Sequence, residues 1–137
     1  MGTEHFDFKA TFSDLDDGLE VLHRSVDRLR RATGRDADDR SLLLFETALG
    51  EIGTNVLTHG SRVRSARPVE YSLRLAGDHV VASLTDSGPP VDEQLARDMP
   101  GRDTEDGRGL AIARSLLDEL GYERDGDLNR WRLVKRL

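Results

Sequence analysis

Three polar side chains recur at four-residue spacing in the segment LGEIGTNVLTHG, residues 49–60. Glu51, Asn55 and His59 would therefore stack along one face of a helix. Such a face is ordinarily solvated surface, but its carboxylate could accept a proton and its amide oxygen could ligate Mg²⁺. The four histidines of the chain show no metal-ligand spacing, so we interpret His59 as a helix-end residue favoured by the helix dipole.

A second polar group lies in TDSGPP, residues 85–90. Asp86 ends a predicted strand, and its parity matches that of Val80 and Leu84, so it shares their face. Turn chemistry alone explains Asp, Ser, Gly and Pro at this point. On a buried face, however, the carboxylate would need a partner such as the exocyclic amine of a ligand, and both interpretations stay open.

A third feature is DGRGLAIA, residues 106–113, in which Gly107 and Gly109 open a predicted helix. Main-chain amides at a helix N-terminus bind phosphate, and glycines allow a close approach. A dinucleotide-binding fingerprint does not fit, because Ile112 stands where its third glycine belongs, and no G-K-[ST] of a P-loop occurs. A plain helix start after a loop is the alternative.

Hydrophobic periodicity predicts the elements that hold these residues. The order is strand, helix, helix, two strands joined at Gly77, a long loop, helix and two strands. This order predicts an α+β fold with helices on one face of a largely antiparallel or mixed sheet. The predicted ranges are a strand at 6–12, a helix at 14–33, a helix ending at 59–60, strands at 69–75 and 79–86, a helix at 109–120, and strands at 121–125 and 130–137.

Composition limits the classes of function. The 137 residues suit one domain, and no apolar run is long enough to span a membrane. The N-terminus lacks the features of a signal peptide, so we expect a cytoplasmic protein. Without Cys there is no disulfide, thiolate metal site or Cys nucleophile, and a net charge of −6 disfavours direct nucleic-acid binding. A protein or small-molecule partner is expected.

In combination, these motifs resemble the Bergerat-fold ATP site of the GHKL superfamily (HATPase_c domains). The order is E-x-x-x-N on a helix, D-x-G after a strand, a lid at about 87–106, and G-x-G-L opening a helix. The short chain most resembles anti-sigma-factor serine/threonine kinases of the RsbW/SpoIIAB type. The resemblance covers residues 6–137 and implies one domain over 1–137, a two-layer α+β sandwich with a mixed, mostly antiparallel sheet.

The resemblance implies roles for four residues at the two ends of the site. Glu51 matches the general base that polarises the serine hydroxyl of a protein substrate. Asn55 matches the ligand of the Mg²⁺ that bridges the ATP phosphates. Asp86 matches the carboxylate that recognises the adenine amine, and Gly88 leaves room for the base.

Four further residues match the end of the ATP lid. Gly107 and Gly109 match the glycines whose amides meet the phosphates. Arg108 and Leu110, within the same G-x-G-L motif, are assigned to nucleotide binding with them.

The implied function is that of an ATP- and Mg²⁺-dependent kinase in a partner-switching system. It would phosphorylate an antagonist protein, bind a sigma factor or similar regulator, and form a homodimer. The leucine stripe at 15–29 could supply a partner surface, although packing on the sheet explains it equally well. Alternatives are a catalytically silent ATP-binding interaction module and the catalytic domain of a histidine kinase, which would need a phosphoacceptor on a separate partner.

Two positions depart from the family pattern. Pro90 stands where many relatives have a second glycine in the adenine motif, and GDLNRW replaces a Gly-Thr near the last strand. Residues 86–106 also carry seven acidic side chains and two arginines, a net charge of −5. Because this charge repels ATP, the sequence predicts that ATP binding requires Mg²⁺.

Overall fold

The computed structural model describes residues 6–60, 67–90 and 105–137, except for the side chains of residues 59, 60 and 105–108. Most of the predicted lid, and the side chains of His59 and Arg108, therefore lie outside the described residues. The described elements are β1 (Asp7–Phe12), α1 (Leu15–Thr33), α2 (Arg40–Gly60), β2 (Val69–Ala76), β3 (His79–Asp86), α4 (Glu105–Leu116), β4 (Glu119–Asp125) and β5 (Leu128–Arg136).

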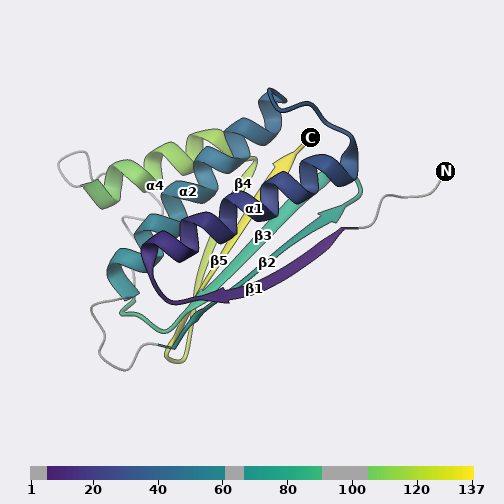
Figure 1. Cartoon of the computed structure of the whole chain (residues 1–137). Coiled ribbons are helices and arrows are strands. Elements are labelled where there is room, and N and C mark those ends of the chain that lie inside the picture. Colours follow the sequence, from purple (N-terminus) through teal and green to yellow (C-terminus); the bar gives the residue numbers. More distant parts are fainter. Residues whose placement is uncertain (1–5, 61–66, 91–104) are drawn as a thin grey trace.

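The five strands form one sheet in the order β1-β2-β3-β5-β4, and every pair in it is antiparallel. The helices α1, α2 and α4 cover one face of this sheet (Figure 1). The predicted two-layer α+β fold is therefore confirmed. The expectation of a mixed sheet is wrong for the described strands, because β5 returns from a hairpin and lies antiparallel to both β3 and β4.

The core lies between the sheet and the helices. Each strand alternates, so that Leu73, Ala82 and Leu133 are fully buried on the helix-covered face. The apolar stripes of α1 and α2 supply the other wall. Its fully or nearly fully buried members are Leu22, Val26, Leu29, Leu42, Phe45, Leu49, Ile52 and Val56. Packing on the sheet therefore accounts for the inner part of the leucine stripe, whereas Leu15 and Leu19 are exposed.

The start of α2 is determined by Asp39, the residue before the helix. Its Oδ1 accepts a hydrogen bond from Leu42 N at 3.0 Å, and this bond, together with the Arg35 guanidinium, lowers the pKa of the Asp39 carboxyl. This cap satisfies a main-chain amide that the helix itself cannot pair. Since α2 carries Glu51 and Asn55, its starting point sets where both side chains lie.

The last helix differs from its predicted range of 109–120 at both ends. It begins at Glu105, four residues earlier. It ends at Leu116, because Asp118 N instead donates to Val134 O at 2.9 Å and the chain enters the sheet. Residues 119 and 120 therefore belong to β4.

Candidate functional site

Glu51 and Asn55 lie one turn apart on the C-terminal half of α2. Glu51 is half-buried, whereas Asn55 retains only 7% of its accessible surface. Because α2 spans both positions and they are four residues apart, the two side chains share a helical face, as predicted. The burial of Asn55 argues against the alternative that this face is simply solvated surface.

The Oδ1 atom of Asn55 is buried and has no hydrogen-bond partner among the described residues. An unpaired buried amide oxygen costs about 1–3 kcal/mol, so such atoms need an explanation. The one other atom of this kind in the described structure is Trp131 Nε1, on an indole ring packed against Tyr122. Asn55 differs because it lies beside a carboxylate, in the position expected of a cation ligand.

Helix α4 brings the glycine motif to Glu51. A Cβ atom added to Gly109 would lie 3.0 Å from Glu51 Oε2, so only a glycine lets α4 approach the carboxylate this closely without displacing it. Gly107 and Arg108 lie in the first turns of α4 rather than in a loop before it. Leu110 is 1% exposed and belongs to the hydrophobic core, which leaves only its main chain for contact with a ligand.

Asp86 ends β3 on the face covered by the helices. It is 5% exposed, and Val80, Ala82 and Leu84, of the same parity, are fully buried. Its Oδ1 accepts a hydrogen bond from Gly88 N at 2.8 Å. Asp86 therefore both stabilises a turn and lies on the buried face. The turn uses only Oδ1 of its carboxylate.

Comparison with known proteins decides the family. The profile of the histidine kinase-like ATPase domain matches residues 12–135, nearly the whole chain. The chain belongs to this family. Domains of the family bind ATP, typically together with Mg²⁺.

Solved structures share the fold of this ATPase domain. The catalytic domain of the histidine kinase ThkA has a TM-score of 0.59 at 14% identity, covering 98% of this chain and 96% of that one. The histidine kinase domain of the blue-light activated kinase from Erythrobacter litoralis gives 0.57 at 21%, covering 93% and 64%. The Acinetobacter baumannii histidine kinase AdeS gives 0.54 at 11%, covering 94% and 67%. No curated protein matches the chain.

The described residues of this ATPase domain fit the ligand that the family implies. The unpaired Asn55 Oδ1 suits an oxygen-ligated divalent cation, and no rearrangement of a protein hydrogen bond is needed to free it. Gly109 lets α4 lie close to the Glu51 carboxylate with no side chain between them. Among the described residues, no group of three or more His, Cys, Asp and Glu side chains could hold a metal ion.

Sequence reasoning missed one residue of this region. Asn129 of β5 is 2% exposed, and its Nδ2 donates to Asp86 Oδ1 at 3.0 Å. It belongs to the GDLNRW segment near the last strand. Strand alternation could have indicated its place, because Asn129 lies on the same side of β5 as Trp131 and Leu133, which face the core.

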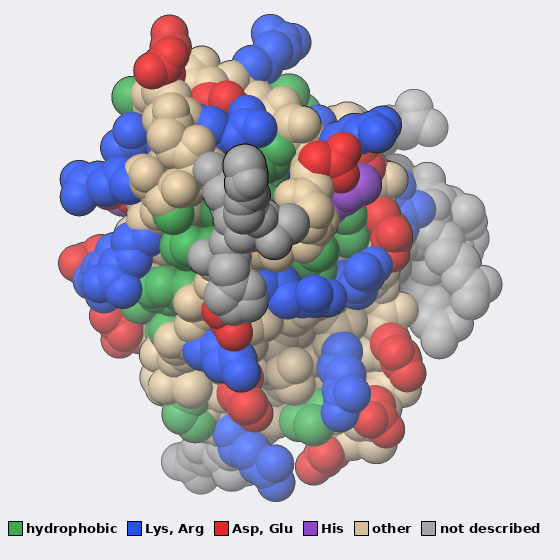
Figure 2. Space-filling model, turned by 90° about the vertical axis from the view of Figure 1, so that its right-hand side faces the viewer, with side chains coloured by type: hydrophobic (Ala, Val, Ile, Leu, Met, Phe, Trp, Pro, Cys, Tyr) green, Lys and Arg blue, Asp and Glu red, His purple; other side chains and the backbone are tan. Residues whose placement is uncertain are grey.

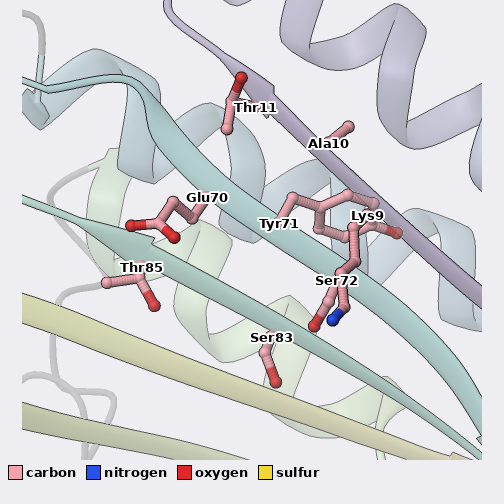
Figure 3. Close-up of a pocket in the computed structure, with 8 residues that line it drawn as sticks. All are labelled: Lys9, Ala10, Thr11, Glu70, Tyr71, Ser72, Ser83 and Thr85. Atoms are coloured by element: carbon pink, nitrogen blue, oxygen red, sulfur yellow. The ribbon is translucent and has the colours of Figure 1, made fainter.

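A groove of about 530 Å³ lies elsewhere, on the sheet face opposite the helices (Figure 3). Its floor consists of hydroxyl side chains on neighbouring strands, including Ser72, Ser83 and Thr85, with Lys9 and Glu70 beside them. None of the predicted site residues lines it. Thr85 faces this groove and its neighbour Asp86 faces the helices, so the alternation of β3 separates the groove from the candidate ATP site.

No described helix is both long enough and apolar enough to cross a lipid bilayer.

Proposed function

We propose that this ATPase domain is a protein kinase that transfers the γ-phosphoryl group of Mg²⁺-ATP to a serine or threonine of a partner protein. The observation that carries the proposal is the buried Oδ1 of Asn55, which has no partner among the described residues and lies one helical turn from Glu51. A kinase site needs a cation ligand and a base close together, because phosphoryl transfer depends mainly on positioning and charge neutralisation. A module that only bound nucleotide would not need the base.

Each residue has a defined task in this proposal. Mg²⁺-ATP, when bound, supplies the phosphoryl group and neutralises part of its charge. Asn55 Oδ1 would ligate the cation, and Asp86 would accept a hydrogen bond from the adenine amine. Glu51 would accept the proton of the attacking hydroxyl, the amide of Gly107 in the first turn of α4 would be open to phosphate, and Gly109 lets the helix approach Glu51 closely.

The choice of a hydroxyl acceptor rests on the chemistry of Glu51 and on the resemblance to anti-sigma-factor kinases. A serine hydroxyl is a weak nucleophile and needs a base to take its proton, whereas a neutral imidazole is already nucleophilic. In a partner-switching role, the kinase would phosphorylate an antagonist protein and bind a sigma factor or similar regulator. The exposed Leu15 and Leu19 at the start of α1 are available to such a partner or to a second copy.

A histidine acceptor is the second candidate, supported by the solved structures, which are histidine kinase domains. The two candidates differ in the stability of the product. Phosphohistidine is lost in acid and retained in alkali, and phosphoserine behaves in the opposite way. The same labelling experiment therefore separates them.

The test is transfer from γ-labelled ATP and Mg²⁺ to candidate antagonist domains, followed by mapping of the phosphosite. Glu51→Gln keeps the size of the side chain and removes the base, so we expect label on serine or threonine to fall by at least about 100-fold while ATP binding is retained. Glu46→Gln, on the same helix but paired with His23, is the matched control and should retain transfer. Acid-labile label, or binding without transfer to any partner, would overturn the serine/threonine assignment.

A further inference from the structure

A cluster of polar side chains lies behind Asp86, and the roles assigned above do not use it. Asn129 stands directly opposite Asp86 in the register of β3 and β5. Tyr122 and Arg124, on β4, complete the cluster. Asn129 is nearly inaccessible to solvent at 2% exposure, so it cannot itself be a major contact surface for a ligand.

The amide of Asn129 has a defined orientation. Its Nδ2 donates to Asp86 Oδ1 at 3.0 Å and to the carbonyls of Gly88 and Pro89 at 3.2 and 2.9 Å. Its Oδ1 accepts from Tyr122 Oη and, at 3.1 Å, from Arg124 Nη1. Exchanging the two amide atoms would oppose donor to donor and acceptor to acceptor, so this network allows only one orientation.

The same network holds the turn that follows Asp86. Arg124 Nη1 donates to Gly88 O at 2.8 Å, so the carbonyl of Gly88 is held from both β4 and β5. Side chains of the last hairpin therefore hold the turn that carries Gly88.

This arrangement divides the two oxygens of Asp86 between different tasks. Oδ1 accepts from both Gly88 N and Asn129 Nδ2, which fixes the plane of the carboxylate. No hydrogen bond from the described residues reaches Oδ2, so that oxygen is left for a donor outside the protein. A carboxylate held in this way presents only an acceptor, and it would attract an amine and reject a carbonyl at the same place.

We propose that Asn129 is the positioning residue that makes this site selective for a purine with an exocyclic amine over one with a carbonyl. Tyr122 and Arg124 act through it by fixing its amide. The inference rests on the proposed nucleotide site, but it does not depend on which residue type receives the phosphoryl group.

The test compares Mg²⁺-ATP with Mg²⁺-ITP, which carries a carbonyl in place of the amine, by calorimetric titration. We expect wild type to prefer ATP by at least about 10-fold, the usual effect of one hydrogen bond to a charged group. In Asn129→Ala this preference should fall to less than about 3-fold, with ITP binding nearly unchanged. Arg130→Ala, the adjacent exposed residue that pairs with Asp125, is the matched control and should keep the preference.

A milder variant keeps the proposal testable if Asn129→Ala does not fold. Tyr122→Phe removes only the hydroxyl that donates to Asn129 Oδ1, and we expect a 2- to 5-fold loss of preference, consistent with one neutral hydrogen bond. Amide exchange at Gly88, whose N–H is held by Asp86, should also become faster in the Asn129 variant.

The outcomes separate the two levels of the proposal. Wild type that binds neither nucleotide would overturn the ATP site and this inference together. Wild type that prefers ATP, with the preference retained in Asn129→Ala, would overturn the inference alone. An equal loss of affinity for both nucleotides in Asn129→Ala would assign Asn129 a purely structural role and would also contradict the inference.

Discussion

Asn55 has the side chain whose environment is least explained by folding alone. Its Oδ1 is buried without a partner in the described structure, so it contributes no hydrogen bond to stability. Replacing such a group by an apolar one of the same branching can be neutral or stabilising. Replacing Asn55 by an apolar residue should therefore weaken the binding of Mg²⁺-ATP without lowering the stability of the fold.

For Asn55→Leu we expect a free energy of unfolding within about 1 kcal/mol of wild type, or higher. Urea denaturation followed by circular dichroism measures this change. A loss above about 3 kcal/mol would show that the amide has a structural partner and would contradict the interpretation of Asn55 as a cation ligand.

Gly109 is the second residue where function and stability should separate. An added Cβ would lie 3.0 Å from Glu51 Oε2, the far end of a flexible side chain, so Glu51 can move away at little cost. Gly109→Ala should leave the melting temperature unchanged or raise it, since Ala favours a helix by about 0.5–1 kcal/mol. Phosphoryl transfer should fall by on the order of 10- to 100-fold because the base is displaced. Undiminished transfer would show that Glu51 is not the base of the reaction.

The contact between α1 and α2 depends on a glycine. A Cβ on Gly53 would lie 2.5 Å from Leu22 Cδ1, whereas one on Gly50, a turn earlier in α2, would meet no described atom within 4 Å. We expect Gly53→Ala to lower the free energy of unfolding by about 1–3 kcal/mol through overpacking. Gly50→Ala is the control and should raise it by about 0.5–1 kcal/mol. Equal effects in chemical denaturation would mean that the two helices are not closely packed.

An ion pair adds a pH-dependent link between the same two helices. His23 Nδ1 and Glu46 Oε2 are 2.7 Å apart, and this hydrogen bond, helped by the charges of Glu46 and Asp27, raises the pKa of His23 above 6.5. The contribution is therefore fully present below pH 6.5 and is lost as the pH rises through the raised value. Because the His23 side chain is 71% exposed, we expect less than about 1 kcal/mol.

Comparing wild type with His23→Gln at pH 5.5 and 8.5 measures this contribution. Wild type should exceed the variant in unfolding free energy at pH 5.5, and the difference should shrink at pH 8.5. A difference that grows with pH would contradict the assigned ion pair.

Over the whole molecule, the order and type of the elements could be predicted from hydrophobic periodicity. Strand alternation also placed Asp86 on the same face as Val80 and Leu84, and the structure shows that this face is buried. The order of strands in the sheet could not be predicted, because nothing local specifies that β5 lies between β3 and β4. The end of α4 was missed for a similar reason, since the bond from Asp118 N to Val134 O joins residues distant in sequence.

The candidate site was predictable in part because its motifs are local. E-x-x-x-N, D-x-G and G-x-G-L are each a few residues long, and their proposed roles came from the resemblance that the three motifs carry in combination. Asn129 could not be assigned a role in the same way, because its partner Asp86 is 43 residues away. Leu110 was predicted with the nucleotide-binding residues, and only packing shows its side chain in the core.

The distribution of charge bears on partners. On the face shown in Figure 2, acidic and basic side chains are interspersed rather than gathered by sign. The prediction that nucleic acid is not a direct partner rests on the net charge of −6 and stays a prediction.

The acidic character of residues 86–106 leads to the most direct test of the ATP site. Calorimetric titration of wild type with ATP should show binding in the presence of Mg²⁺ and at least about 10-fold weaker binding with EDTA, because a net charge of −5 repels the free phosphates. In Asn55→Leu, the difference made by Mg²⁺ should shrink. Equal binding with and without Mg²⁺, or no binding under either condition, would contradict a Mg²⁺-ATP site built on Asn55 and Glu51.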